Sequence, residues 1–385
     1  MSPVPNILLV CAEASGDLHG GHLVEAARET VPGARWFGCG GDHLEAAGME
    51  LIHHVREMSV LGLADVIRAY PRLRRIFYDL VDAARERRPI LAVLIDSPDF
   101  NLRLAKPLRR LGIPILYYVS PQVWAWKAGR IWKIARLVDR LMCIFPFEPA
   151  LYAGTGLAVD YIGHPLADEV RVHRSRAVTL ADYGLDPAKP TVALLPGSRR
   201  HEVAYLLPVF VATARRLQRD LPDCQYLLSR APTVDPARVS AALAELPGHA
   251  ALIEGPIHDA VAASDLVWVA SGTASLEVAL LRRPMVILYK AGWLTAAIAK
   301  RVVTIPHLGM VNVLGRREVV PELLQENVTP ERLLAASLPL LTDPAAAARQ
   351  VADIDALVRN LDRGGASRRA AEIVAEMVAA VGSRR

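Results

Sequence analysis

The sequence lacks several features that mark common protein classes. None of its stretches approaches the ~20 consecutive apolar residues that a membrane-spanning helix needs. Its amino terminus has no basic region before a short apolar run, so we expect a first strand there rather than a signal peptide. The net charge of +5 is modest for 385 residues and no nucleic-acid-binding motif is present, so a nucleic-acid partner is not expected.

Cysteines and aromatic residues are also scarce. The four cysteines lie outside metal-ligand spacing of one another, and we expect all of them to be reduced, buried core residues. Aromatic residues make up 6% of the chain, whereas hydrophobic residues make up 52% and charged residues 22%, which is typical of a globular protein with many helices packed on buried strands. A chain of 385 residues exceeds one ordinary core, so two domains are expected.

Short apolar runs alternate with amphipathic stretches in both halves of the chain. Runs of this length are typical of strands buried on both faces, and their alternation with helices predicts parallel, doubly wound sheets. The predicted strands are 6–12, 36–39, 91–95, 115–119, 141–144 and 159–162, then 191–195, 225–228, 251–253, 266–270 and 285–289. The sequence therefore predicts an α/β protein with two tandem Rossmann-like domains.

The boundaries of these domains follow from a polar break. Residues 168–189 are charged, carry Gly184 and Pro187, and are followed by Pro190, which predicts an interdomain linker with room for a short helix. We expect one domain over 1–170, a second over 171–355, and carboxy-terminal helices over 356–385. Ligands of such sheets bind beyond the carboxyl ends of the strands, so two facing sheets suggest a central cleft.

Two glycine turns in the second half follow predicted strands and precede predicted helices. In residues 194–199 (LLPGSR), Gly197 allows a sharp turn, the helix N–H groups after Ser198 favour an anion, and Arg199 adds a charged bond to a phosphate. Residues 271–277 (SGTASLE) repeat this pattern, with Glu277 placed to accept ribose hydroxyls. A turn with a helix cap is the alternative for each segment. Together they favour a site for the phosphates and ribose of a nucleotide.

Acidic residues in the first half also follow predicted strands. Asp96 lies at the carboxyl end of a buried strand, where a general base is expected, whereas Asp99 is expected to cap the following helix. Glu13 and Asp17 lie in a glycine-containing turn that lacks the full GxGxxG spacing. Because no cluster of His, Asp and Glu suggests a metal site, a reaction without metal is predicted.

Two further segments point to a lipid or sugar surface. Residues 118–133 hold three of the six tryptophans, interleaved with cations, which favours contact with a sugar or a lipid interface; a core corner is the alternative. Residues 58–69, with a basic flank, predict an apolar helix at a membrane surface or along a lipid groove; a buried helix is the alternative.

In these segments the sequence resembles the lipid-A-disaccharide synthase family, over most of the chain and in the expected order. The matching stretches are AEASGD (12–17), MSVLGLADV (58–66), IDSPDFN (95–101), YYVSPQVWAWKAGRI (117–131), FPFE (145–148), YIGHP (161–165), LLPGSRRHEV (194–203), ASGTASLEVALL (270–281) and VNVLGRREVVPELLQE (311–326). The resemblance implies a GT-B fold and an inverting transfer of 2,3-diacylglucosamine from its UDP donor to 2,3-diacylglucosamine 1-phosphate, giving the β(1→6) lipid A disaccharide 1-phosphate and UDP. It also implies a cytoplasmic enzyme peripheral to the inner membrane that needs no metal or other cofactor.

The same resemblance implies roles for individual residues. Asp96 is the general base, and Glu13 orients the acceptor or shares the base role. The donor and UDP residues are Gly197, Ser198, Arg199, Ser271, Gly272, Thr273, Glu277, Asn312 and Glu318. The acceptor and lipid residues are Ser15, Gly16, Met58, Val60, Leu61, Trp124, Trp126, Lys127 and Arg130.

Several alternatives stay open on the sequence. Another GT-B enzyme acting on a UDP-sugar, such as an N-acetylglucosaminyltransferase or a 2-epimerase, would share the nucleotide-binding half, and a non-catalytic nucleotide-sugar sensor would not need Asp96. The sequence does not decide between Asp96 and Glu13 as the base, between a monomer and a homodimer, or between glucosamine and a diamino sugar. The carboxy-terminal helices either pack back on the first domain or exchange between subunits.

Overall fold

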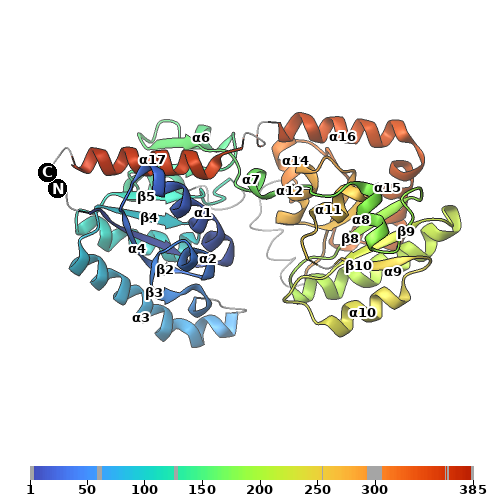
Figure 1. Ribbon diagram of the computed structural model, residues 1–385, viewed down its shortest axis with the longest axis horizontal. Helices are drawn as coiled ribbons and strands as arrows, with labels where there is room; N and C mark the ends of the chain where they lie inside the picture. Colours follow the sequence, from blue (N-terminus) through green and yellow to red (C-terminus); the bar gives the residue numbers. More distant parts are fainter. Residues whose placement is uncertain are drawn as a thin grey trace. The chain divides into compact units, whose positions relative to one another are not determined.

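The computed structural model describes residues 4–58, 63–124, 129–253, 255–292, 306–359, 361 and 364–382, with side chains placed in all of these except 63–68. The chain divides into two compact units (Figure 1). The first comprises Met1–Pro165 and Arg363–Arg385, and the second comprises Leu166–Asp362. No helix among the described residues is long and apolar enough to cross a membrane.

A sheet of seven parallel strands forms the centre of the first unit, in the order β3-β2-β1-β4-β5-β6-β7. Its strands are β1 (Asn6–Cys11), β2 (Arg35–Gly40), β3 (Glu50–His54), β4 (Leu91–Ile95), β5 (Ile115–Tyr118), β6 (Arg140–Cys143) and β7 (Ala158–Tyr161). The helices are α1 (Ala14–Thr30), α2 (Asp42–Ala46), α3 (Leu63–Arg87), α4 (Pro98–Arg110), α5 (Arg130–Leu137), α6 (Glu148–Leu151) and α17 (Ala366–Gly382), with the short 3-10 helix η1 (Val55–Glu57). Side chains of α3, α4 and α5 share a hydrophobic core with one face of the sheet.

The second unit repeats this plan with six parallel strands in the order β10-β9-β8-β11-β12-β13. Its strands are β8 (Thr191–Leu195), β9 (Gln225–Ser229), β10 (Ala250–Ile253), β11 (Leu266–Ala270), β12 (Met285–Tyr289) and β13 (Glu322–Leu324). The helices are α7 (Leu166–Glu169), α8 (Arg176–Asp182), α9 (Arg200–Asp220), α10 (Pro236–Glu245), α11 (His258–Ala263), α12 (Thr273–Leu280), α14 (Met310–Gly315), α15 (Pro330–Thr342) and α16 (Pro344–Val358), with the short 3-10 helix η2 (Gln325–Asn327). Two doubly wound parallel sheets were predicted, and this prediction is confirmed.

Two edge strands were not predicted from the sequence. The segments of β3 and β13 lie at the outer edge of their sheets, and most of their side chains are only partly buried. An edge strand is not covered on both faces, so it can carry polar residues. Neither segment therefore shows the continuous apolar run that marks the central strands. All four cysteines are free and buried, as expected.

The carboxy-terminal helix α17 belongs to the first unit, where the red helix runs beside the blue α1 (Figure 1). Thr30 Oγ1 donates to the carbonyl oxygen of Ala371 at 3.2 Å, and the Arg369 guanidinium donates to the carbonyl oxygen of Ile162 at 2.7 Å. The buried face of α17 consists of Ala366, Ala370, Ala371, Ile373 and Val374. Within this chain the helix therefore packs back on the first unit, one of the two arrangements that the sequence left open.

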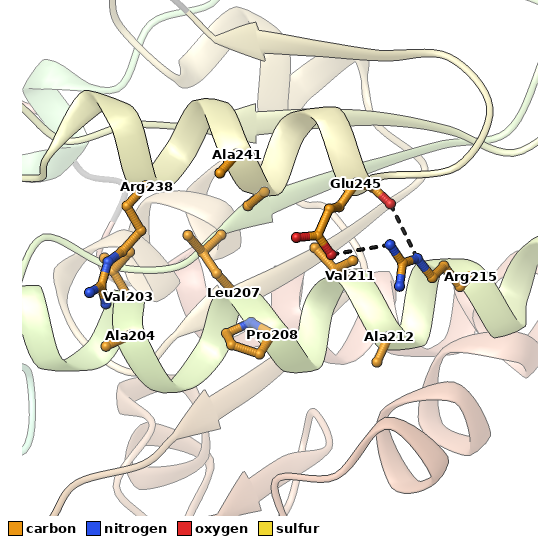
Figure 2. A pocket seen from close by; sticks show the side chains of 11 residues that line it. Val203, Ala204, Leu207, Pro208, Val211, Ala212, Arg215, Arg238, Ala241 and Glu245 are labelled. Atoms are coloured by element: carbon orange, nitrogen blue, oxygen red, sulfur yellow. Dashed lines mark hydrogen bonds and ion pairs between the residues drawn. The ribbon is translucent and has the colours of Figure 1, made fainter.

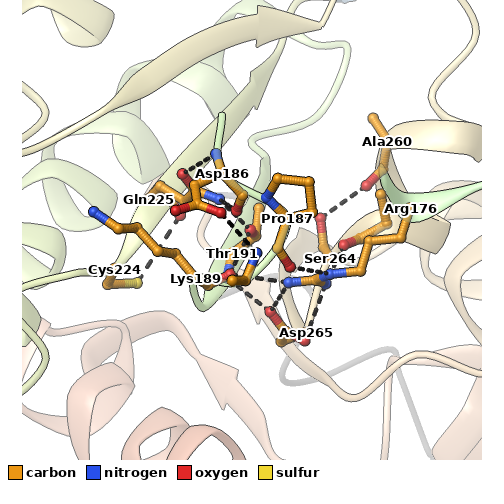
Figure 3. A network of polar contacts seen from close by, with 12 residues as sticks. Arg176, Asp186, Pro187, Lys189, Thr191, Cys224, Gln225, Ala260, Ser264 and Asp265 are labelled. Atoms are coloured by element: carbon orange, nitrogen blue, oxygen red, sulfur yellow. Dashed lines mark hydrogen bonds and ion pairs between the residues drawn. The ribbon is translucent and has the colours of Figure 1, made fainter. Parts of the chain in front are cut away.

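The predicted linker packs on the second unit through a polar network around Arg176 (Figure 3). The Arg176 guanidinium forms a bidentate pair with Asp265, at 3.1 and 2.9 Å, and also donates to the carbonyl oxygens of Pro187, Lys189 and Ala263. Asp265 in turn accepts the Thr191 N–H at 2.8 Å. Because α7 and α8 group with the second unit, the division falls after Pro165 rather than after residue 170, and the second unit continues to Asp362 rather than to 355.

Candidate active site

The predicted site residues follow the strands at which each sheet reverses its strand order. In the first unit β1 lies beside β4, and in the second β8 lies beside β11, although neither pair is consecutive in the sequence. A parallel sheet opens a crevice at the carboxyl ends of such a pair, and ligands bind there. Glu13 and Asp96 follow β1 and β4, whereas residues 196–199 and 271–273 follow β8 and β11. Each unit thus holds one candidate binding edge.

Asp96 is held in an unusual backbone conformation at the end of β4. Asp96 and Ser97 have φ angles of 47° and 45°, in the left-handed region that few residues other than glycine adopt. The Asp96 carbonyl oxygen accepts hydrogen bonds from Asn101 Nδ2 at 2.9 Å and from the Tyr117 hydroxyl at 2.5 Å, and the Asp96 N–H donates to Tyr118 O at 3.0 Å. Three hydrogen bonds to its main-chain atoms therefore fix the backbone from which the carboxyl group projects.

The environment of Asp96 raises the pKa of its carboxyl group. The largest cause is partial burial, and the nearby Glu13 carboxylate adds to it, while the Ser97 N–H and His19 act in the opposite direction. A carboxylate that holds a proton more firmly is a stronger base, which suits proton abstraction. Because Glu13 is exposed and acts on Asp96 through its charge, the structure brings the two predicted catalytic residues into one site.

Two other residues of the amino-terminal turn, Gly16 and Asp17, stabilise the fold of the first unit. Gly16 is buried, and a Cβ atom there would lie 3.0 Å from that of Cys11, so it allows α1 to pack on the sheet. Asp17 is also buried, and its carboxylate accepts the N–H groups of Gly41, His43 and Leu44 at 2.6, 3.0 and 3.2 Å, at the start of α2. Ser15 is exposed on the first turn of α1.

The tryptophan-rich segment 118–133 is described except for residues 125–128. Trp126 and Lys127 lie outside the described residues, as do Val60 and Leu61. The Trp124 ring packs edge-on against Phe147 with the centroids 5.5 Å apart. Met58, expected on an apolar surface, is buried in the core of the first unit.

Arg130 begins α5 and pairs with Asp99. Asp99 was expected to cap α4, and this prediction is wrong. The cap position belongs to Ser97, and Asp99 lies in the first turn of the helix. The pair leaves the Arg130 side chain only 16% exposed, beside Tyr117.

The loop after β8 holds a carboxylate where a phosphate was expected. Gly197 has a φ of 99°, and a Cβ atom there would lie 2.6 Å from Glu202 Oε2. The Glu202 carboxylate accepts the Arg199 N–H at 3.4 Å and the Arg199 guanidinium at 2.7 Å, at the amino end of α9. Arg199 is 68% exposed and Ser198 is exposed, so both remain available to a ligand.

The loop after β11 brings in a residue that the sequence did not single out. Gly272 and Thr273 are exposed, and Ser271 is half-buried with its N–H donating to Leu288 O at 2.8 Å. Glu277 Oε2 lies 3.2 Å from His258 Nε2, which comes from the first position of α11. A glycine–proline turn followed by a helix was the only available signal for His258, and it does not indicate chemistry.

Asn312 is placed by the structure inside the protein rather than on a binding surface. Its side chain is fully buried; Nδ2 donates to Val320 O and Glu322 Oε2, and Oδ1 accepts the N–H groups of Val319 and Val320. These four bonds saturate the amide, so Asn312 has no hydrogen-bonding atom left for a nucleotide. Glu318 is exposed on the turn that this amide holds.

The cavity between α9 and α10 lies away from these strand ends. A cavity of about 320 Å³ lies between α9 and α10, with Leu207 between the helices and Arg215 reaching Glu245 at 3.1 Å (Figure 2). It opens along the helix flanks rather than at the carboxyl ends of the strands. Among the described residues, no group of three or more His, Cys, Asp or Glu side chains is placed to hold a metal ion.

Comparison with known sequences gives matches along the whole chain. The family model described as lipid-A-disaccharide synthetase matches residues 7–377. A lipid-A-disaccharide synthase of Anaeromyxobacter sp. (strain K) is 44% identical over 369 residues, which are 96% of each chain. That of Geobacter metallireducens is 40% identical over 380 residues, or 98% of this chain and 99% of the relative.

Comparison with solved structures shows the fold. The calicheamicin glycosyltransferase CalG4 superposes with a TM-score of 0.63 at 16% identity, covering 98% of this chain and 99% of its own. A UDP-N-acetylglucosamine 2-epimerase of Neisseria meningitidis, bound to its UDP-sugar, gives a TM-score of 0.60 at 12% identity, covering 97% and 100%. Glycosyltransferases and epimerases of this kind share the GT-B fold, in which two Rossmann-like units follow one another.

Proposed function

The chain belongs to the lipid-A-disaccharide synthase family, and from this premise we propose that Asp96 is the general base of a transfer between two acylated glucosamines. The protein is a glycosyltransferase that acts in the synthesis of the lipid A disaccharide. Its donor is UDP-2,3-diacylglucosamine and its acceptor is 2,3-diacylglucosamine 1-phosphate. One observation carries the assignment of the base: the Asp96 carboxyl group is partly buried, has a raised pKa, and lies where the sheet reverses its strand order.

The proposed reaction is a single displacement. The oxygen of the acceptor's 6-hydroxyl attacks C1 of the donor sugar as the bond from C1 to the diphosphate breaks. The electron pair leaves with UDP, the configuration at C1 inverts to β, and Asp96 takes the hydroxyl proton. The side chains of Asn101 and Tyr117 donate hydrogen bonds to the carbonyl oxygen of Asp96 and hold its backbone in place for this step. Positioning and proton transfer together account for large rate increases in enzymes.

The donor is proposed to bind at the carboxyl edge of the second unit. Arg199 and Ser198 contact the diphosphate, Ser271, Gly272 and Thr273 contact its other side, and Glu277 accepts the ribose hydroxyls. Arg199 is exposed beside the amino end of α9, where positive charge favours a phosphate. Its present partner Glu202 must give up the guanidinium or share it with the phosphates. Asn312 supports the site by holding the turn that carries Glu318.

The acyl chains are proposed to bring the enzyme to the cytoplasmic face of the inner membrane. The helix α3 exposes Tyr70 and Tyr78, which are 60% and 51% exposed, with Arg74 over the ring of Tyr78. Trp132 on α5 is 55% exposed. Aromatic rings flanked by cations are typical of surfaces that rest on anionic lipid headgroups.

Mass spectrometry of the product tests the function. With both acylated substrates we expect a disaccharide 1-phosphate and one UDP for each product molecule, and no UDP when the acceptor is left out. A 2-epimerase would instead convert the UDP-sugar without an acceptor, and a sensor would bind it without releasing UDP. The reaction is expected to proceed equally well in EDTA, because no metal takes part in the proposed step.

A further inference from the structure

The turn after β6 contains a carboxyl group buried inside the first unit. Glu148, the first residue of α6, is completely buried. Its Oε2 accepts the N–H groups of Ile144 and Phe145 at 3.2 and 3.0 Å. Burying a carboxyl group costs free energy unless both its oxygens are hydrogen-bonded, and Oε1 has no partner among the described residues, so this group is kept at the expense of stability. Its two bonds fix the backbone of residues 144–148.

This turn supports the tryptophan-rich segment. It carries Phe145 and Phe147, whose rings are stacked with centroids 5.8 Å apart, and Phe147 packs edge-on against Trp124 at 5.5 Å. Glu148 Oε1 and Trp124 Nε1 are both buried, and neither makes a hydrogen bond to a described residue. A carboxylate oxygen and an indole N–H in one buried cluster are complementary partners.

The segment that Trp124 belongs to starts beside the catalytic carboxyl group. Tyr118 O accepts the Asp96 N–H, and Val119 follows with a φ of 67°. A β-branched residue is strained in this conformation, and such strain persists only where the surroundings hold it. Ser120 is buried, with its hydroxyl 3.1 Å from that of Tyr152. Part of the required support therefore comes from α6 and the residue after it.

We propose that Glu148 is a positioning residue for the transfer reaction: it fixes the turn 144–148, against which Trp124 packs, and its ionised carboxylate attracts the Trp124 indole N–H, so that it sets the conformation of residues 119–124 next to Asp96. This inference rests on the proposed function, because it assumes that these residues receive the acceptor. It assigns Glu148 no contact with the substrates.

The protonation of Glu148 connects this support to pH. Burial raises the pKa of Glu148 to about 7, while the N–H groups of Phe145 and Ile144 and the side chains of Trp124 and Ser120 act in the opposite direction. When ionised, the carboxylate attracts the indole N–H. When protonated, it places a second donor in the same space, which weakens its hold on Trp124.

The titratable neighbours of Glu148 do not replace its charge near pH 7. Burial raises the pKa values of the Cys143 thiol and the Tyr152 hydroxyl, so both stay neutral there. Asp160 on β7 is paired with Arg140, and the His164 ring packs against Phe145 with the centroids 5.2 Å apart. We therefore expect activity to rise with pH through about 7 as Glu148 ionises.

Glu148→Gln tests the proposal, because glutamine can accept the same two N–H bonds but does not titrate. We expect an unfolding midpoint near that of the wild type, a loss of about tenfold or more in kcat/KM for the acceptor, an unchanged KM for the donor, and no rise in activity near pH 7. Glu148→Asp, which keeps a titratable carboxyl group on a shorter side chain, should retain that rise. Unchanged acceptor kinetics together with an unchanged pH profile in Glu148→Gln would overturn the proposal.

Tyr152→Phe is the matched control from the same buried cluster. It removes the hydroxyl beside Ser120 and should lower the unfolding temperature while keeping the rise in activity near pH 7. If Tyr152→Phe also abolishes that rise, the rise depends on the packing of the buried cluster rather than on the ionisation of Glu148, and the proposal is wrong. Failure of the proposed function is distinguishable, because the wild-type protein would then make no disaccharide at all.

Discussion

The left-handed backbone at Asp96 and Ser97 is the most telling feature at the scale of single residues. Each such conformation costs roughly 1–3 kcal/mol and persists only when the surroundings hold it. Here the buried Asn101 holds it by donating to the carbonyl oxygens of Ile95 and Asp96, both at 2.9 Å. Strain at this position, in a carboxyl group with a raised pKa, indicates that direction and basicity are maintained at a cost in stability.

Asp96→Asn is expected to lower turnover by roughly two or more orders of magnitude, because the amide cannot accept the proton. The unfolding temperature should stay the same or rise, since the variant no longer buries an ionisable group. In the wild type, activity should fall as the pH is lowered through the raised pKa of Asp96, above the usual range for an aspartate. Steady-state kinetics as a function of pH check this. Near-normal turnover in Asp96→Asn, with a large loss in Glu13→Gln, would transfer the base role to Glu13.

Glu277→Gln is expected to raise the KM for the donor about tenfold or more, because a charged acceptor of two ribose hydroxyls is lost. His258→Ala should cause a smaller increase, since His258 only holds the carboxylate, with 3.2 Å between Nε2 and Oε2. Steady-state kinetics measures the KM for the donor, and titration calorimetry measures the corresponding affinity for UDP. Glu245→Gln is the control. It alters an exposed pair between Glu245 of α10 and Arg215 of α9, and the variant should bind UDP normally. Equal affinities in all three variants would remove Glu277 from the site.

Residues at strand ends could be predicted from the sequence, and residues that act through distant partners could not. Asp96 and Arg199 follow strands with strong apolar runs, so their positions after the strand ends could be predicted from the sequence. Asp17 lies in the same turn as Glu13, but it accepts N–H groups at the start of a helix 24 residues further along the chain, a contact that the local sequence does not show. Glu148 and His258 depend on contacts that arise only when separate segments fold together.

At the scale of elements, the strands show the same division. Central strands such as β4 and β11 are buried on both faces and form unbroken apolar runs, so their bounds were predicted correctly. The edge strands β3 and β13 face solvent in part and lack such runs. The linker was predicted from its polar residues, and the way in which its helix α8 is fixed to the second unit was not, because Arg176 meets its acceptors only in the folded chain.

Arg176→Ala is expected to destabilise the second unit by about 2 kcal/mol, as the loss of charged hydrogen bonds to Asp265 and to backbone carbonyls leaves those groups unpaired. Arg174→Ala is the matched control two residues earlier. It removes only a pair with Asp182 in which both side chains are more than half exposed, worth less than about 1 kcal/mol. Urea unfolding compares the two variants. Equal midpoints would show that the network does not fix α8.

At the scale of the whole molecule, α17 completes a unit that begins at the other end of the chain. Arg140, already paired with Asp160 at 2.7 Å, also reaches Glu376 of α17 at 2.6 Å. Removing residues 364–385 is expected to expose the apolar face that α1 presents to this helix and to unfold the first unit preferentially. Hydrogen exchange should show lost protection in α1 and β1 and retained protection in β8 and β11. Protection that is unchanged in α1 would contradict this.

The division of the first unit between both ends of the chain also sets the order in which the protein matures on the ribosome. The 197 residues of Leu166–Asp362 separate its two parts. At roughly 5–20 residues per second, translation of that stretch takes about 10 to 40 s. During this time the second unit can fold while the first still lacks its last helix. A nascent chain would thus acquire the proposed donor-binding half first, and its proposed acceptor-binding half would be finished only once α17 has left the ribosome, which delays catalysis until then.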